Sequence, residues 1–210
     1  MMIKRTLNDS TLFSLSVKYM EEDRSSSIVI AGVDEAGRGA LAGPVVAGAC
    51  IIKSKYLPSF ICDSKQLSSD ERDKAFEWIK EYCLYGFGIV TAQEVDTLRI
   101  LDATEKAMQR AVMQLSKIMK PTYLLIDGRD KFWFDYPHSS IIDGDILEPC
   151  ISAASIVAKV TRDRIMKKHD RIFPHYDFKC HKGYGTPEHF DLIKSRGVCG
   201  IHRKSFLHIE

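Results

Sequence analysis

The sequence predicts one α/β layer fold, and two observations predict it. Short apolar runs rich in β-branched residues alternate with stretches whose apolar residues recur at helical spacing. The chain has 210 residues with 45% hydrophobic content, which is enough for one globular domain with an ordinary core. Strands separated by helices are typical of a covered sheet rather than of a helical bundle or a barrel.

The first half of the chain predicts three strands and a helix. Residues 28–33 form an apolar run that suits a strand buried on both faces, and residues 44–52 follow a glycine-rich turn, close enough to pair with it as a hairpin. A serine cap and first-turn acids at 68–71 indicate the start of a helix. Residues 86–91 form the third predicted strand.

The second half of the chain predicts two long helices and two further strands. Apolar positions recur at helical spacing from 102 to 120, and Pro121 closes this element. Residues 123–126 and 140–142 are predicted strands that stop near carboxylates, and apolar residues between 151 and 165 define a second amphipathic helix. The predicted layer fold therefore contains five strands with helices between them.

Charge and cysteine content exclude several classes of protein. The 30 basic and 28 acidic residues nearly balance, so any nucleic-acid surface must be a local patch. The six cysteines are scattered without a C-x-x-C pair, which argues against a zinc site or a redox motif and favours reduced thiols. Because residues 1–27 lack a continuous apolar segment, we expect a polar lead-in before a domain at 28–210, in a soluble cytoplasmic protein without membrane contact.

Carboxylates at strand ends are the strongest chemical signal. Asp34 with Glu35, Asp127, and either Asp143 or Asp145 follow three predicted strands. Loops at the carboxyl edge of an α/β sheet converge on a crevice where ligands bind. Acids gathered in one cleft repel one another unless a cation neutralises them, and oxygen ligands without histidine or cysteine select Mg²⁺ or Mn²⁺. Two such ions, roughly 3.5 to 4 Å apart, can activate a water and stabilise the leaving oxygen of a phosphodiester.

The neighbouring acids Asp34 and Glu35 set a geometric condition. Successive side chains on a regular strand point to opposite faces, so we expect the chain to leave regular strand geometry here, helped by Gly37 and Gly39. For a lone Asp-Glu pair, the alternative is an acidic turn that caps a helix. The G-x-G-x-x-x-G spacing that ends at Gly43 differs from the dinucleotide fingerprint, and two acids precede it, which argues against a metal-free phosphate cradle.

A second group of candidate residues lies near the C-terminus. Residues 179–186 combine basic side chains with Tyr184 between two glycines, which could stack on a sugar or base while lysines such as Lys182 contact phosphates. The alternative is a solvated loop that leads into a helix at Glu188, with His181 as a satisfied structural histidine. Residues 202–205 add a further basic patch with the same two interpretations.

These segments resemble the ribonuclease HII family, in the same order along the chain. VDEAGRG at 33–39 is similar to the family's opening motif, DSKQLS at 63–68 to its D-S-K-x-L-S segment, and IDG at 126–128 to its third-acid motif. ISAASIVAKVTRD at 151–163 resembles the long family helix, and HKGYGT at 181–186 resembles the substrate loop. The resemblance runs from about residue 28 to residue 206, and its glycine-arginine-glycine argues against the type 3 branch.

The resemblance implies a ribonuclease H-like fold, with a mixed five-stranded sheet flanked by helices and a small C-terminal helical part that binds substrate. It also implies a site for two divalent ions, Mn²⁺ or Mg²⁺, whose ligands and catalytic residues would be Asp34, Glu35, Asp127 and Asp145. The implied reaction is hydrolysis of the RNA strand of RNA/DNA hybrids and incision 5′ of ribonucleotides in duplex DNA. This reaction leaves 3′-hydroxyl and 5′-phosphate ends.

The resemblance assigns roles in substrate binding as well. Gly37, Arg38 and Gly39 would read the ribose 2′-hydroxyl, the group that distinguishes RNA from DNA. Tyr184 would pack on the sugar at the RNA-to-DNA junction. Contacts to the nucleic-acid backbone are implied for Ser64, Lys65 and Lys182. We expect a monomer, and the sequence leaves open whether a replication clamp or a polymerase recruits it.

The chain departs from the family pattern at three places. Residues 143–149, DGDILEP, lack the usual basic residue before the fourth acid and the Ser-Lys after it, so Asp145 competes with two neighbouring carboxylates. Arg99 stands where asparagine is usual, and Gln66 stands where lysine is common. Two other interpretations therefore stay open: a ribonuclease H-like nuclease that acts on DNA, and a nucleic-acid-binding module whose metal site is disabled.

Overall fold

A mixed five-stranded sheet forms the centre of the computed structural model, which describes residues 28–54, 56–61 and 67–207. Its strands, in the order β3-β2-β1-β4-β5, are β1 (Ile30–Ala36), β2 (Val45–Ile52), β3 (Cys83–Val90), β4 (Tyr123–Asp127) and β5 (His138–Ile141). β1 pairs antiparallel with β2 and parallel with β4. The predicted fold class is confirmed, whereas the predicted lead-in at 1–27 lies outside the described residues.

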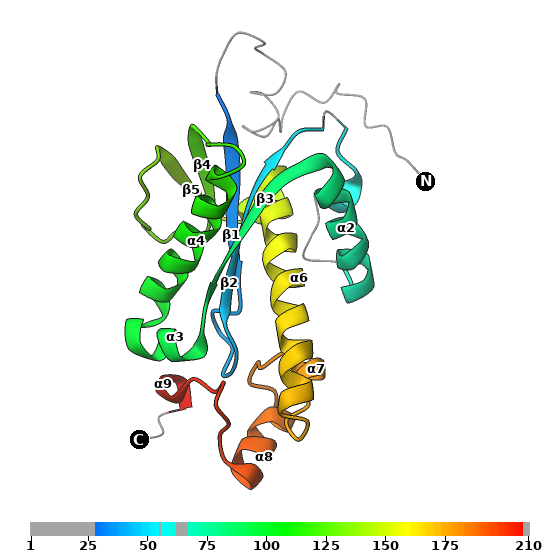
Figure 1. The fold of residues 1–210 in the computed structure, drawn as a ribbon, viewed down its shortest axis with the longest axis vertical. Helices are drawn as coiled ribbons and strands as arrows, with labels where there is room; N and C mark the ends of the chain where they lie inside the picture. Colours follow the sequence, from blue (N-terminus) through cyan, green and yellow to red (C-terminus); the bar gives the residue numbers. More distant parts are fainter. Residues whose placement is uncertain (1–27, 55, 62–66, 208–210) are drawn as a thin grey trace.

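Helices cover both faces of the sheet (Figure 1). They are α2 (Ser69–Tyr82), α3 (Ala92–Leu98), α4 (Ile100–Ser116), α5 (Gly144–Leu147), α6 (Pro149–Ile172), α7 (Phe178–His181), α8 (Pro187–Arg196) and α9 (Lys204–Leu207), with a short 3-10 turn η1 (Ser59–Ile61). α3 and α4 lie on one face, and α2 and α6 lie on the other. α4 ends at Ser116, four residues before the predicted end at Lys120, and α6 continues past the predicted helix to Ile172.

The start of α2 follows directly from its sequence. The Ser68 hydroxyl accepts a hydrogen bond from the Glu71 backbone N–H at 3.3 Å, and the Glu71 carboxylate accepts one from the Ser68 N–H at 2.8 Å. This reciprocal capping box satisfies two amide donors that the first turn of a helix leaves unpaired. The predicted helix start is therefore confirmed.

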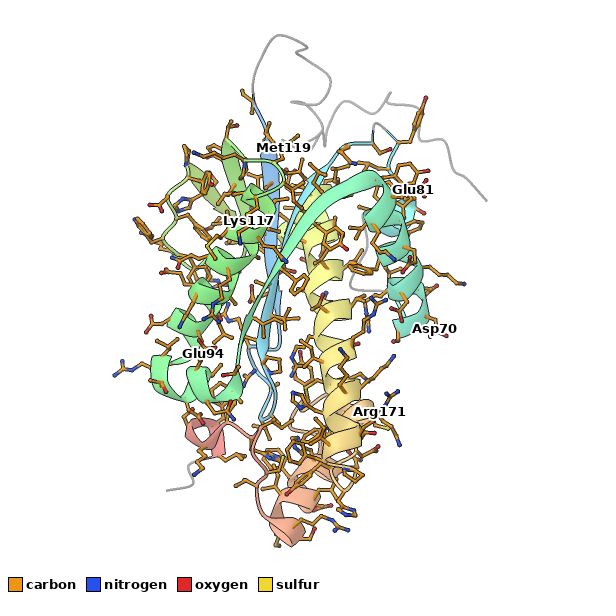
Figure 2. The ribbon with its side chains drawn as sticks, in the orientation of Figure 1. Asp70, Glu81, Glu94, Lys117, Met119 and Arg171 are labelled. Atoms are coloured by element: carbon orange, nitrogen blue, oxygen red, sulfur yellow. The ribbon has the colours of Figure 1, made fainter. Side chains whose placement is uncertain are left out.

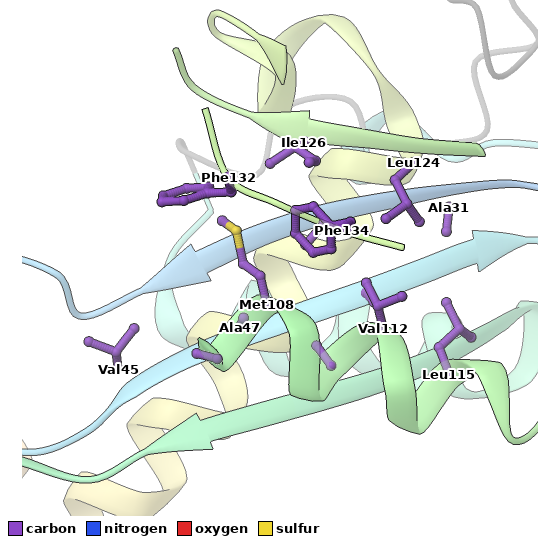
Figure 3. Close-up of a cluster of buried hydrophobic side chains, with 14 of the residues drawn as sticks. Ala31, Val45, Ala47, Met108, Val112, Leu115, Leu124, Ile126, Phe132 and Phe134 are labelled. Atoms are coloured by element: carbon purple, nitrogen blue, oxygen red, sulfur yellow. The ribbon is translucent and has the colours of Figure 1, made fainter. Parts of the chain in front are cut away.

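The face of the sheet under α4 holds the larger hydrophobic core. Met108, Val112 and Leu115 project from α4 onto residues of β1, β2 and β4 (Figure 3). Their labelled partners in this cluster are Ala31, Val45, Ala47, Leu124, Ile126, Phe132 and Phe134. Burial of this apolar area holds the strands that carry the acidic residues in a rigid layer.

α6 approaches the other face of the sheet so closely that only glycine fits beneath it. A Cβ atom on Gly32 of β1 would lie 2.1 Å from the backbone carbon of Cys150, and one on Gly48 of β2 would lie 2.2 Å from the Ala154 carbonyl oxygen. Real Cβ atoms do not come this close to other heavy atoms. These two glycines therefore set the height of α6 above the strands, and with it the position of Arg162 further along the helix.

The C-terminal elements pack around the second half of α6. Ala42 of the β1–β2 turn, Met166 of α6, Tyr176 and Phe178 form a separate buried cluster there. Figure 1 shows α7, α8 and α9 gathered at the same end of the molecule as this turn. Charged side chains such as Asp70, Glu81 and Arg171 project away from the sheet (Figure 2). Within the described ranges, no helix is long and apolar enough to span a membrane.

Arg99 occupies a backbone conformation that favours other residues. It separates α3 from α4 with a φ of +70° and a ψ of 160°, a region that essentially only glycine adopts without strain. The family resemblance predicts asparagine at this position. The departure at Arg99 therefore lies at a strained junction between two helices, where the Val95 carbonyl accepts the Arg99 N–H at 3.1 Å.

Candidate active site

Asp34 and Glu35 lie inside regular strand β1. Asp34 is opposite Gly48 of β2 and Glu35 is opposite Ala47, so the prediction that the chain leaves strand geometry at this pair is wrong. The pairing of β1 with β4 ends at Val33, opposite Ile126, which places both acids just beyond the paired stretch. Asp34 Oδ1 accepts a hydrogen bond from the Glu35 N–H at 2.7 Å, so this carboxylate lies along the strand edge. Asp34 and Glu35 can thus both contribute a carboxylate to the same edge of the sheet, although their Cα–Cβ bonds point to opposite faces.

Burial and neighbouring negative charges both disfavour the ionised forms of the acidic residues in this site. Burial raises the pKa of the Asp34 carboxyl well above its usual range, and the nearby Glu35 and Asp127 carboxylates raise it further. Burial also raises the pKa of Glu35, although the Arg38 guanidinium acts in the opposite direction. Asp127 and Asp130 add to the rise at Glu35. Carboxylates from β1 and from the end of β4 therefore share one region of negative potential.

Arg38 links this acidic edge to the loop after β4. Its Nη1 lies 3.2 Å from Glu35 Oε1 and 2.8 Å from Asp130 Oδ2. The guanidinium is about one third exposed, so solvent screens part of this attraction. Arg38 thus partly neutralises Glu35 while about one third of its side chain stays open to solvent.

The predicted fourth acid, Asp145, lies beside the third. The Asp145 backbone N–H donates to Asp127 Oδ1 at 3.2 Å, and Asp145 is buried at the start of α5. Asp143 precedes that short helix in the left-handed region, with φ +54°, and its side chain is exposed. This hydrogen bond places the backbone of Asp145 against the Asp127 carboxylate.

The donor set fits a hard divalent cation, although the carboxylates are not already gathered around one point. Among the described residues, no three histidine, cysteine or carboxylate side chains form a ready cage for a metal ion. Glu35 Oε2 is nonetheless buried without a hydrogen-bond partner in the described part of the chain. A bound cation would stabilise this buried oxygen and would lower the raised pKa values of the neighbouring carboxyl groups. The carboxylates would therefore need side-chain rotation to bind an ion together.

The raised pKa of Asp34 predicts a pH-dependent stability of the metal-free protein. The Asp34 carboxyl keeps its proton to a higher pH in the folded state than in the unfolded state, where an aspartate titrates at about pH 4. The free energy of unfolding therefore falls as pH rises from that value through the raised pKa. Urea denaturation in a chelator at a series of pH values should show this fall, and Asp34→Asn should reduce it. An identical pH dependence in the variant would contradict this assignment.

Two buried arginines hold the glycine-rich turn between β1 and β2. Arg203 donates to the carbonyl oxygens of Gly37, Arg38 and Gly43, at 2.8, 2.9 and 3.0 Å. Arg162 of α6 donates to the carbonyls of Pro44 at 3.0 Å and of Ala42 at 3.1 Å. Burial lowers the pKa of Arg203 to about 9, which still leaves the guanidinium charged at neutral pH.

Within this turn, Gly37 and Gly39 have different surroundings. Gly37 has φ +94°, and a Cβ there would lie 2.1 Å from Arg162 Nε, so only glycine fits. A Cβ on Gly39 would meet no atom within 4 Å. The turn is thus closed on the Arg162 side and open at Gly39, where a ligand can approach the backbone.

The loop that carries Tyr184 is joined to the same turn. Ala40 pairs with Tyr184, and the Gly183 carbonyl accepts from the Leu41 and Ala42 N–H groups at 2.8 and 3.1 Å. The Arg162 guanidinium lies over the Tyr184 ring, 4.9 Å from its centre, while the ring remains 41% exposed. The structure therefore brings together two candidate segments that lie far apart in the sequence.

The remaining predicted contact residues have different outcomes. Lys182 is half-buried and donates to the carbonyl of Lys179. His181 is satisfied on both ring nitrogens, as in the structural interpretation. Residues 202–205 are not the predicted basic surface patch, because His202 and Arg203 are buried. Ser64 and Lys65 lie outside the described residues.

Several residues of the site carried no functional signal in the sequence. Asp130 binds Arg38, while Arg162 and Arg203 support the turn from below. Charged residues are rarely fully buried, so residue type alone predicts a surface position for both arginines. Only the many backbone carbonyls that converge on them could have identified these residues.

A mixed sheet with an acidic edge and a helical C-terminal part defines the chain as a ribonuclease H-like α/β protein. Residues 31–209 match the family model described as Ribonuclease HII. The chain therefore belongs to the ribonuclease HII family and is a ribonuclease H, an endonuclease that hydrolyses RNA in RNA/DNA hybrids.

Sequence relatives agree with this assignment. The chain is 50% identical over 181 residues to ribonuclease HII of Clostridioides difficile (strain 630). The aligned residues cover 86% of this chain and 70% of the relative. It is 49% identical over 179 residues to ribonuclease HII of Syntrophus aciditrophicus (strain SB), covering 85% and 84%. Identity at this level over most of both chains supports a shared fold and family.

Solved structures are similar in fold. The ribonuclease H2 of Pyrococcus horikoshii OT3 superposes with a TM-score of 0.68 at 27% identity, covering 85% of this chain and 93% of that one. Ribonuclease HII of Archaeoglobus fulgidus, solved in a complex with PCNA, gives 0.70 at 22% identity, covering 84% and 94%. Bst-RNase HIII in complex with Mn²⁺ gives 0.62 at 16% identity, covering 87% and 66%. The predicted ribonuclease H-like fold is confirmed.

Proposed function

We propose that this ribonuclease H incises duplex DNA on the 5′ side of embedded ribonucleotides, as well as cutting the RNA strand of hybrids, and leaves 3′-hydroxyl and 5′-phosphate ends. The observation that carries the proposal is the joining of three features at one end of the sheet. The acidic edge of Asp34, Glu35 and Asp127 leads directly into the glycine turn, and that turn pairs with the Tyr184 loop. A cutting site thus adjoins a surface suited to one sugar.

The acidic edge supplies the ligands for divalent cations. Asp34, Glu35, Asp127 and Asp145 would hold Mn²⁺ or Mg²⁺, because hard oxygen donors without nitrogen or sulfur select these ions. When two such ions are bound, they would activate a water and stabilise the leaving oxygen. Arg38 forms an ion pair with Glu35 and keeps about one third of its side chain exposed, so it could also contact a phosphate.

The glycine turn supplies discrimination for ribose. Gly39 is exposed and leaves its backbone open to a close approach, so the main chain of residues 37–39 can hydrogen-bond a 2′-hydroxyl. The half-exposed Tyr184 ring would pack on the neighbouring sugar, and Lys182, Ser64 and Lys65 would contact phosphates. A deoxyribose in the same place lacks the hydroxyl group that the turn would bind.

The decisive experiment uses a labelled DNA duplex with one ribonucleotide. We expect one cut on its 5′ side in the presence of Mn²⁺ or Mg²⁺, no cut with chelator, and no cut of the matched all-DNA duplex. Association should weaken as salt increases, because phosphate contacts release counterions. Equal cutting of the all-DNA duplex would favour a DNA nuclease, and binding without turnover in saturating metal would favour a non-catalytic module.

We also propose that the chain acts as a monomer on its nucleic-acid substrate. The Archaeoglobus fulgidus relative forms a complex with PCNA, which makes a sliding clamp a candidate partner for this chain. Size-exclusion chromatography with and without a clamp protein tests both statements.

A further inference from the structure

Three histidines lie behind the Tyr184 loop, on the side away from solvent. His189 of α8 is fully buried, His202 is nearly so, and His181 of α7 is half-buried. The rings of His181 and His189 stack, with centroids 4.1 Å apart and planes inclined by 16°. Phe178 packs its ring against all three. Neither the proposed reaction nor the acidic edge uses these side chains.

The hydrogen bonds around His202 and His189 determine where each ring carries its proton. The backbone N–H of Cys199 donates to His202 Nδ1 at 2.9 Å, so that nitrogen accepts and the proton of a neutral ring is on Nε2. His202 Nε2 lies 3.1 Å from His189 Nε2 and therefore donates to it. His189 Nε2 then accepts, which leaves the proton on Nδ1, 2.9 Å from the Tyr184 carbonyl oxygen.

His181 completes the same pattern on the other side of the loop. The backbone N–H of Gly183 donates to His181 Nδ1 at 3.0 Å, so the His181 Nε2 proton points to the Tyr176 carbonyl at 2.5 Å. All three rings are then neutral, and every ring nitrogen has a partner. Burial lowers the pKa of His189 to about 4 and also lowers the pKa of His202, which favours the neutral forms.

We infer that His189 is a positioning residue for Tyr184, and that a directed chain of hydrogen bonds, from the Cys199 N–H through His202 and His189 to the Tyr184 carbonyl, orients the tyrosine for substrate. This histidine relay holds the backbone of Tyr184, while Arg162 lies over its ring and Ala40 pairs with it across the turn. The inference rests on the proposed function, because only in that function does the exposed Tyr184 ring pack on a substrate sugar.

Two substitutions at position 189 separate the two ends of the relay. The amide nitrogen of asparagine can replace Nδ1, so His189→Asn keeps a donor for the Tyr184 carbonyl and loses the contact with His202. The longer amide of glutamine reaches the place of Nε2, so His189→Gln keeps the contact with His202 and loses the bond to Tyr184. The two variants are matched in polarity and differ in which partner they retain.

The kinetic test measures both variants on the duplex with one ribonucleotide. We expect His189→Gln to raise KM about tenfold with kcat within about twofold, the scale of one lost hydrogen bond. The KM of His189→Asn should stay close to the wild-type KM. In a Tyr184→Ala background, His189→Gln should add no further increase, because both changes act through the same side chain. A drop in kcat at unchanged KM, or equal KM values for the two variants, would overturn the inference.

A second measurement does not depend on activity. Nitrogen-15 NMR of the imidazole rings in the wild-type chain at neutral pH should show His189 protonated on Nδ1, and His181 and His202 protonated on Nε2. Any other tautomer for His189 contradicts the relay even if the enzyme cuts as proposed. Conversely, if the wild-type chain does not cut at the ribonucleotide, the proposed function is wrong. The NMR result still decides the direction of the hydrogen bonds in the relay.

Discussion

Asp127→Asn is expected to lower the rate of cutting at an embedded ribonucleotide by about 10³-fold or more, the scale seen when one member of a catalytic unit is removed. Asparagine has nearly the same shape as aspartate, and its carbonyl oxygen can still accept the hydrogen bond from the Asp145 N–H. The fold should therefore survive, while the proposed metal site would lose one of its negative charges. Single-turnover kinetics in saturating Mn²⁺ measures this loss directly.

The control for this experiment is Asp135→Asn, an exposed aspartate in the loop between β4 and β5. It changes the net charge by the same amount and should cut like the wild type. Duplex binding by Asp127→Asn should persist, and its free energy of unfolding without metal should equal or exceed the wild-type value, because one like charge near Asp34 is gone. Cutting at more than about a tenth of the wild-type rate would remove Asp127 from the proposed metal site.

Arg203→Met is expected to cause the largest loss of stability. Methionine has a similar length but removes the donors to the carbonyls of Gly37, Arg38 and Gly43. The Gly37 carbonyl keeps only the long 3.4 Å bond from the Ala40 N–H, and the other two carbonyls lose the guanidinium as their donor. Each buried polar group left unsatisfied costs roughly 1–3 kcal/mol, so we expect the free energy of unfolding to fall by about 3 kcal/mol or more. Urea denaturation measures this change, and KM for the ribonucleotide duplex should rise because the turn loses its support.

Lys204→Met is the matched control for Arg203→Met. Lys204 is the next residue, its side chain is exposed, and its backbone N–H, which bonds Asp96, is unchanged by the substitution. We expect its stability to stay within about 0.5 kcal/mol of the wild type. If Arg203→Met were equally stable, the turn would not depend on this guanidinium, and the support assigned to it here would be wrong.

The elements of the fold differ in how far their sequences predict them. The capping box of α2 and the apolar repeat of α4 are local patterns, and both helices form where those patterns lie. The end of α4 was harder to place, since apolar residues continue to Met119 after the helix has ended at Ser116. Ile118 and Met119 are exposed, so periodicity without packing does not extend a helix.

The geometry at Asp34 and Glu35 shows a limit of reasoning from strand periodicity. The alternation rule predicts that two neighbours on a regular strand cannot reach one site, yet β1 remains regular through both. The rule describes the directions of Cα–Cβ bonds, whereas Asp34 turns its carboxylate back along the strand edge to its neighbour's N–H. The distance between carboxylates therefore depends on side-chain rotamers and on where β4 stops pairing.

The sequence alone determined the fold class, the family and the acidic residues at the strand ends, because these depend on local patterns and on motifs in a characteristic order. Only the tertiary structure decided the roles of Arg162, Arg203, His189 and His202. Each of these polar side chains is buried, and the carbonyl partners of the two arginines lie between 118 and 166 residues away in the chain. A buried charge or imidazole is stable only if distant backbone groups converge on it, and that convergence exists only after the chain has folded.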